Sequence, residues 1–222
     1  MVFGGFRRRS FLNDLHVLDV NLWRWQTVRI RGDGPAARVY HSATVIDAHR
    51  VLFFGGNNLH QCFNDIHILD TSGGDGNWKW EAMVAGGVRP RPRSGHTATL
   101  LPGGKRLLVW GGWDVVTLAD DDGPARSGKP SDSDPVHGGE RLLHASAYND
   151  AWELDLQTWC WTRRKVTGSS ADVGDGGVVA TQGRIGHGAV AVVDVSGAVS
   201  LCAFGGQAAD ERFADVRMMP VT

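Results

Sequence analysis

The chain has 222 residues, a formal net charge of -1, 30 glycines and 9 tryptophans. A chain of this length can bury a sizeable core. Its near-neutral charge excludes a strong positive field of the kind that would attract nucleic acids or anionic membranes. No apolar run reaches the roughly 18–20 residues that span a bilayer. The 3 cysteines are an odd number without paired spacing, which favours a reduced, cytoplasmic protein.

The first segment, residues 1–30, begins with a short apolar run that ends at Gly4-Gly5. Two adjacent glycines lack Cβ atoms, so another backbone can pass closely and positive φ angles are allowed. A strand with apolar residues at alternate positions then follows Asp14, and Trp25 closes the segment. These signals predict three short strands.

Three further segments repeat this order at residues 36–84, 91–166 and 184–219. Each opens with an Arg-x-x-His signature and a strand of small residues, before the apolar run, the Gly-Gly pair and the Asn-Asp or Ala-Asp pair. The recurrence of the same signals in four successive segments indicates a propeller or a solenoid. The repeat positions are Gly4, Gly5, Gly55, Gly56, Gly111, Gly112, Gly205 and Gly206, Asp14, Asp65, Asp150 and Asp215, Trp25, Trp80 and Trp161, Arg38, Arg93 and Arg184, and His41, His96 and His187.

This order resembles the kelch repeat over almost the whole chain. The resemblance implies that each unit is one four-stranded blade of a β-propeller, with strands A to D. We therefore expect an all-β kelch-type propeller or an incomplete arc of one. Counting gives strands B-C-D, A-B-C-D, A-B-C-D and A-B-C, about fourteen strands in two full and two partial blades. A ring of this family usually has more blades, so we expect a partial protein.

The repeated arginines and histidines are expected to have structural roles. Each repeated histidine stands at the same position of a different blade. Repetition at one structural position favours a role in packing and hydrogen bonding over metal ligation. Only Tyr40 and Tyr148 could supply the tyrosine ligands of a copper site like that of galactose oxidase, and neither has histidines at a usable spacing. No phosphate-binding loop or hydrolase motif occurs. We therefore expect no metal, no cofactor and no catalytic residue.

The loops between strands B and C and between strands D and A should emerge on one face, because successive strands of a meander alternate in direction. In kelch domains this face commonly holds the partner site. Clustered arginines with an exposed Trp would suit an acidic peptide, although polar loops also carry arginines without any such role. The candidate residues are Arg7, Arg8, Arg9, Arg31, Asn57, Asn58, His60, Gln61, Arg89, Arg91, Trp113 and Gln207.

A long insert, residues 114–147, interrupts the B–C link of the third unit. It is rich in Asp, Ser, Gly and Pro, a composition that cannot bury enough surface to order itself. A disordered surface loop is favoured over a binding element, and both interpretations stay open.

The sequence favours a non-catalytic protein-interaction module. Two alternatives stay open: a metal-dependent enzyme or specifier protein on the kelch scaffold, and a substrate adaptor for a ubiquitin ligase. The expected partner is another protein, with an acidic peptide segment as a candidate, and neither nucleic acid nor membrane. Unpaired edges of the partial blades would also permit self-association.

Overall fold

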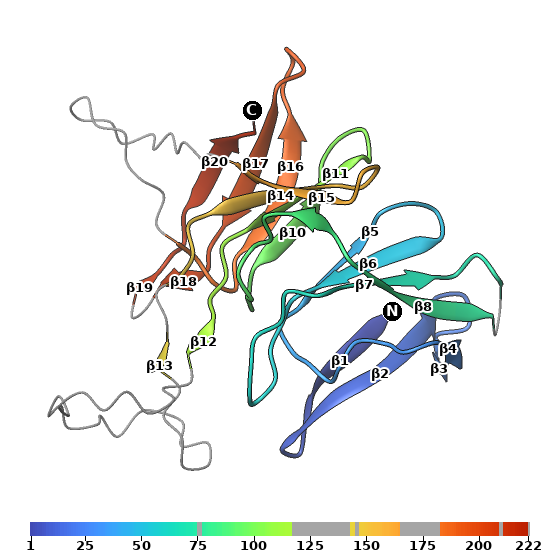
Figure 1. Ribbon diagram of the computed structural model, residues 1–222. Helices are drawn as coiled ribbons and strands as arrows, with labels where there is room; N and C mark the ends of the chain where they lie inside the picture. The colour runs from blue at the N-terminus through green and yellow to red at the C-terminus, as the bar shows by residue number, and fades with distance from the viewer. Residues whose placement is uncertain (75–76, 117–142, 145–146, 165–182, 209–210, 222) are drawn as a thin grey trace, which may run out of the picture.

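The computed structural model describes residues 1–74, 77–116, 143–144, 147–164, 183–208 and 211–221. Within these residues the strands form four main sheets that fan out like the blades of a propeller, and no helix occurs (Figure 1). This architecture confirms the expected all-β kelch-type fold. We number the sheets blade 1 to blade 4 in chain order.

The sheets are antiparallel meanders, and their innermost strands line the inside of the arc. Blade 1 contains β1 (Val2–Arg7), β2 (Ser10–Asp19) and β3 (Arg24–Thr27). Blade 2 contains β5 (Ser42–Val45), β6 (Arg50–Phe54), β7 (Ile66–Asp70) and β8 (Trp78–Met83). Blade 3 contains β10 (Thr97–Leu100), β11 (Arg106–Trp110), β14 (Ala151–Asp155) and β15 (Cys160–Arg164). Blade 4 contains β16 (Gly188–Val193), β17 (Val199–Phe204) and β20 (Val216–Pro220).

Six short strands lie outside this expected set. β4 (Ile30–Arg31) and β9 (Gly86–Gly87) belong to the D–A links, and each pairs in parallel with the outermost strand of the following blade. β12 (Val115–Val116) pairs with β13 (Leu143–His144), and β18 (Gln207–Ala208) with β19 (Glu211–Arg212). These two ribbons extend the B–C links of blades 3 and 4. No helix of the described chain is long and apolar enough to cross a membrane.

The insert 114–147 falls mainly on residues 117–142, which lie outside the described part of the chain. The same holds for residues 165–182 of the link between blades 3 and 4. The expectation that the insert is a surface loop therefore stays a prediction.

The core consists of three apolar clusters, one between each pair of consecutive blades. We call the side of a blade that meets the next blade its forward face, and the other side its backward face. Between blades 2 and 3, for example, Phe54 and Ile66 of the forward face pack against Leu154 and Trp161 of the backward face. Among the described residues no such cluster joins blade 4 to blade 1, so the four blades form an open arc.

The Gly-Gly pairs lie where neighbouring backbones approach most closely. Gly56 has a φ of +89°, and a Cβ atom there would lie 2.7 Å from the carbonyl oxygen of Val39 and 2.8 Å from the Cβ of His41. Gly5 holds the equivalent position in blade 1 with a φ of +108°, but no atom lies within 4 Å of its Cβ position. The difference arises because blade 1 has no described strand inside β1.

We expect Gly56→Ala to lower the free energy of unfolding by more than about 2 kcal/mol, because it combines a positive φ with a backbone clash. Gly5→Ala meets only the unfavourable φ and should cost about 1 kcal/mol. Chemical denaturation of the two variants tests this difference. Equal losses would show that the close approach at Gly56 contributes nothing.

Candidate functional site

Blades 2, 3 and 4 each contain a buried arginine that binds the loop-side ends of strands B and C. Arg38 has a side chain that is 1% exposed, and its guanidinium donates to both carboxylate oxygens of Asp65, at 2.6 and 2.8 Å. It also donates to the carbonyl of Gly55 at 2.9 Å. The same arrangement recurs as Arg93 with Asp150 and Gly111, and as Arg184 with Asp215 and Gly205. These repeat residues therefore hold the base of the B–C loop in blades 2, 3 and 4.

An aromatic ring covers each of these guanidinium groups. The Cζ of Arg38 lies 4.0 Å from the ring centroid of Phe63, and such a contact adds cation–π attraction. Tyr148 at 4.8 Å from Arg93 and Phe213 at 4.2 Å from Arg184 do the same. The sequence reasoning missed these rings, although an aromatic residue stands two positions before Asp65, Asp150 and Asp215.

The carboxylates of this arrangement stay ionised. Burial opposes ionisation of Asp65, but hydrogen bonds from Arg38 and His67 outweigh it and hold the pKa of Asp65 well below its usual value. The pKa of Asp150 is lowered in the same way, against burial, mainly by Arg93. Asp14 of blade 1 holds the equivalent position and contacts His16 at 2.7 Å, as Asp65 contacts His67 at 3.1 Å, but it pairs with no arginine among the described residues.

The repeated histidines lie between blades, where each ring packs on an aromatic residue of the preceding blade. The centroid distances are 5.4 Å for Phe3 and His41, 5.2 Å for Phe54 and His96, and 4.4 Å for Trp110 and His187. His96 also makes a 2.9 Å hydrogen bond between its Nε2 and the hydroxyl of Ser42. Within the described residues no group of three or more His, Cys, Asp or Glu could hold a metal ion.

Burial gives these histidines a pH-dependent effect on stability. Burial and the neighbouring arginines lower the pKa of His96 to about 3 and those of His41 and His187 to about 4, from 6.5. The unfolded chain therefore binds more protons as the pH falls below 6.5. We expect the melting temperature to be stable above pH 6.5 and to fall steadily towards pH 4.

The variant His96→Gln provides the control, since Gln can still bond to Ser42 but does not titrate. Its melting temperature should depend less steeply on pH between 6.5 and 4.5. The paired carboxylates do not contribute in this window, because their stabilisation is lost only below their unfolded value of 3.8. Thermal melts of both proteins across this range measure the slopes, and identical slopes would contradict a buried neutral His96.

The B–C loops of all four blades lie at one end of the strands, which we call the loop face. In Figure 1 this end carries the β1–β2 turn, β12, β13, β18 and β19. Arg8 and Arg9 form the two-residue turn between β1 and β2, and their φ angles of 47° and 71° fit a type I′ turn. The fold therefore holds two arginines at the tip of a hairpin.

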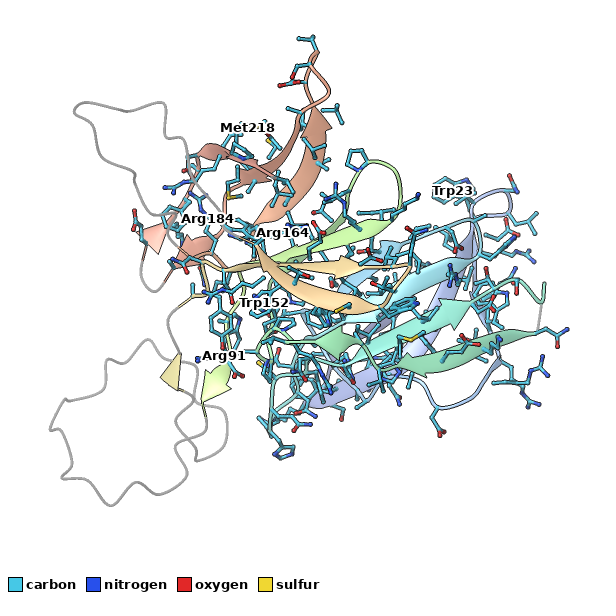
Figure 2. All side chains as sticks on the ribbon, turned by 45° about the horizontal axis from the view of Figure 1, so that its top comes forward. Trp23, Arg91, Trp152, Arg164, Arg184 and Met218 are labelled. Atoms are coloured by element: carbon cyan, nitrogen blue, oxygen red, sulfur yellow. The ribbon has the colours of Figure 1, made fainter. Side chains whose placement is uncertain are left out.

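Several of the candidate binding residues are exposed on this face. Arg7 is the last residue of β1, Arg8 and Arg9 form the β1–β2 turn, and Figure 2 shows Arg91 beside the start of β12. The other exposed candidates are His60, Gln61, Arg89 and Gln207.

Three candidates are placed differently. Asn57 is 8% exposed and accepts a 2.7 Å hydrogen bond from Ser94, and the Asn58 side chain accepts from the backbone of its own loop. Both asparagines therefore shape the loop. Arg31 lies at the other end of the strands, where it donates to Asn77 at 3.1 Å. We leave these three residues out of the proposed contact surface.

Trp113 is partly buried, so the expectation that it is exposed is wrong. Its indole nitrogen lies 3.4 Å from the Cβ position of Gly95, and its backbone pairs with Ser94. The reason is that the third unit's B–C link begins by pairing with the segment before strand A. Trp113 therefore joins two loops of the face.

Tyr40 is a feature of the loop face that the sequence reasoning did not assign to it. It is 69% exposed and has a φ of 53°, a conformation that is strained for a bulky residue. The equivalent positions are Gly95 and Gly186, with φ angles of 63° and 65°. A Tyr at a glycine position was the available signal, and strained, exposed residues of this kind often have a function.

Comparison with known proteins supports the repeat assignment. The chain matches the family described as the KLHDC2/KLHL20/DRC7 Kelch-repeats domain over residues 1–122. It is 35% identical over 115 residues to Acyl-CoA-binding domain-containing protein 5 of Arabidopsis thaliana, which covers 51% of this chain and 17% of that protein. It is 41% identical over 101 residues to Kelch domain-containing protein 3 of Bos taurus, covering 45% and 25%.

A longer match joins the chain to Host cell factor 1 of Homo sapiens. The two are 26% identical over 186 residues, which cover 76% of this chain and 8% of that protein. The chain thus matches a quarter or less of the length of each of these three relatives.

Proposed function

Because the chain belongs to the kelch-repeat family, whose domains are generally protein-interaction modules, we propose that it binds a partner protein without catalysing a reaction. The contact surface is the loop face, and the partner contributes an acidic segment. The arginines Arg8, Arg9, Arg89 and Arg91 carry this proposal, since all four are exposed. Arg8 and Arg9 form the B–C turn of blade 1. Arg89 and Arg91 flank Pro90, whose carbonyl accepts a 3.1 Å hydrogen bond from Asn64 in the B–C link of blade 2.

These arginines are available to a partner. None of them forms an ion pair with another described residue. Arginine binds carboxylates through two parallel hydrogen bonds, which gives both affinity and orientation. Positive groups around a surface also accelerate the encounter with a negatively charged partner.

Tyr40 supplies the apolar contact of the same surface. Tyrosine and arginine are over-represented among the residues that dominate binding energy at protein interfaces. The strain at Tyr40 has no compensating contact in the core, since the side chain is largely exposed. We therefore assign to Tyr40 the role of an aromatic anchor beside the arginines.

Two sets of variants separate binding from stability. Arg8→Asn/Arg9→Gly places the preferred Asn-Gly pair in the type I′ turn and removes two charges, while Tyr40→Gly installs the residue found at the equivalent positions. Both should keep or raise the melting temperature. Both should weaken binding of a fluorescently labelled oligo-glutamate peptide at least about tenfold in anisotropy titrations, a loss of roughly 1.4 kcal/mol.

Arg31→Gln is the matched control, because it removes an exposed arginine from the opposite end of the strands. Its affinity for the peptide should equal that of the parent chain, and the parent's affinity should fall as salt is added. Equal weakening by Arg31→Gln would indicate general charge attraction. Undetectable binding at low salt would contradict the acidic partner.

No observation favours the alternative of a metal-dependent enzyme or specifier protein, since the described residues contain no metal-binding group. Metal analysis of the purified protein is the direct test. We also propose a cytoplasmic location, because the 3 cysteines are an odd number without paired spacing, as expected of a protein in a reducing compartment.

A further inference from the structure

Ser10 lies at the tip of the β1–β2 hairpin, directly after three arginines. The sequence there reads Arg7-Arg8-Arg9-Ser10. Arg8 and Arg9 form the turn, and Ser10 is the first residue of β2 and pairs across the hairpin with Arg7. All four residues are exposed. An exposed serine therefore lies beside two of the arginines that carry the proposed partner contact.

The arginines of this hairpin tip have no counter-charge. Within the described residues, none of Arg7, Arg8 and Arg9 forms an ion pair. Arg7 lies directly opposite Ser10 in the hairpin, and the Cβ atoms of such pairs are about 4.5–5.5 Å apart. A phosphate group on Ser10 would thus come within reach of a guanidinium group, which binds phosphate through two parallel hydrogen bonds.

The positions of these arginines also match the needs of one class of enzyme. Protein kinases that select basic substrates bind arginines two and three residues before the acceptor serine, through charge-assisted hydrogen bonds to acidic side chains. Arg8 and Arg7 hold these two positions relative to Ser10. The acceptor must also fit the kinase cleft, and the exposed tip of a hairpin can open locally at a small cost in free energy.

Ser94 shows why the sequence pattern alone is not enough. It also follows arginines, since Arg91 stands three residues before it and Arg93 one residue before it. However, Ser94 is 0% exposed and its hydroxyl donates a 2.7 Å hydrogen bond to Asn57. A kinase cannot reach this hydroxyl in the folded chain. The structure therefore selects Ser10 over Ser94.

We propose that Ser10 is a phosphorylation site for a protein kinase that selects arginines, and that its phosphorylation releases the acidic partner from the loop face. The Oγ of Ser10 attacks the γ-phosphorus of ATP, and the bond from this phosphorus to the bridging oxygen breaks. ADP leaves with the electron pair of that bond, and the hydroxyl proton passes to a base of the kinase.

The new group acts on the partner contact through its charge. Phosphoserine carries a charge of about −1.5 to −2 at neutral pH. It pairs with the arginines of the hairpin tip and repels a carboxylate-rich segment, so the loop face loses attraction for its partner. This effect on binding rests on the proposed function, whereas the modification of Ser10 does not.

Phosphate incorporation into the full chain tests the site. The chain is incubated with ATP and the catalytic subunit of a kinase of this basic specificity, and mass spectrometry of the intact chain and of its peptides counts and locates the phosphate. We expect one phosphate, on Ser10, and none in Ser10→Ala. Arg7→Gln should slow the incorporation at least about tenfold, because the kinase loses one charge-assisted contact.

Two control variants should be modified like the parent chain. Ser72→Ala removes an exposed serine that no arginine closely precedes. Arg24→Gln removes the arginine three residues before Thr27, which is also exposed but has Trp25 rather than arginine two residues before it. Equal slowing by Arg24→Gln and Arg7→Gln would overturn the assignment to Ser10.

Anisotropy titrations with the labelled oligo-glutamate peptide test the consequence. The phosphorylated chain should bind the peptide at least about tenfold more weakly than the unmodified chain, and a phosphatase should restore the affinity. Ser10→Ala, treated with the kinase in the same way, should keep the affinity of the unmodified parent.

The outcomes separate this inference from the proposed function. If the folded chain takes up no phosphate on Ser10 while a synthetic peptide of residues 4–13 does, the fold protects the serine and the inference is overturned. Uptake on Ser10 without a change in affinity would overturn the release of the partner. An unmodified chain that binds no peptide would overturn the proposed function, and the incorporation result would still decide whether Ser10 is a phosphorylation site.

Discussion

Replacing Arg93 with Met should lower the free energy of unfolding by about 3–5 kcal/mol, because it leaves the carboxylate of Asp150 without its counter-charge. The Arg93 side chain is 0% exposed and that of Asp150 only 15%. The substitution also removes the donor to the carbonyl of Gly111 and the cation that stacks on Tyr148. Denaturant-induced unfolding, followed by far-UV circular dichroism, measures the change.

Three further variants identify the origin of the loss. Arg93→Lys keeps the charge but cannot form the two parallel bonds to Asp150, so it should be intermediate. Arg93→Met/Asp150→Leu removes both charges and should be less destabilised than Arg93→Met alone. Arg106→Met changes a side chain that is 41% exposed and contacts Glu153 at 3.4 Å, and it should cost less than about 1 kcal/mol. If Arg93→Met also cost less than about 1 kcal/mol, the buried pair would have no structural role.

The repeat made the fold predictable because every unit solves the same packing problem. A Gly-Gly pair predicts a close backbone approach, and Gly56 and Gly112 have neighbouring backbone oxygens at 2.7 and 2.8 Å from their Cβ positions. A repeated arginine and a repeated aspartate predict a recurring contact, but one sequence does not show that they bind each other. The pairing of Arg38 with Asp65 required the structure, since the two residues are far apart in the chain.

What the repeat could not predict is where the equivalence between units ends. Trp25, Asp14 and Gly5 share their sequence signals with buried or bonded residues of later blades, yet they lack those neighbours because no described strand or sheet covers that side of blade 1. The repeat pattern also could not predict that Arg31 lies at the end of the strands opposite the loop face. Loop direction follows from strand order, whereas the crossing of the D–A link along the outer edge of the next blade, through β4, depends on the twist of the sheets.

The candidate site shows the same limit. Charge clustering led to Arg8, Arg9, Arg89 and Arg91, because exposed loops and charged residues can be recognised from sequence. Tyr40 was not among the candidates, because the feature that distinguishes it is a positive φ angle, which only a comparison with Gly95 and Gly186 could have suggested. Trp113 was misplaced because burial of a loop residue depends on contacts between two distant segments.

Replacing Trp161 with Ala should lower the free energy of unfolding by about 3–5 kcal/mol, the usual cost of removing a large buried aromatic side chain. Trp161 is 3% exposed and packs against Phe54, Leu154 and other members of the cluster between blades 2 and 3. Its loss would leave a cavity between the sheets of blades 2 and 3, which pack against each other through this side chain. The effect should appear as a shift of the denaturation midpoint with an unchanged slope.

Trp25→Ala is the matched control, because the two tryptophans hold the same repeat position and differ only in what covers them. Since Trp25 is 58% exposed, its replacement should cost less than about 1 kcal/mol when measured at low protein concentration. Equal losses for the two variants in dilute solution would mean that Trp25 is already buried within a single chain, and the open arc would then be wrong.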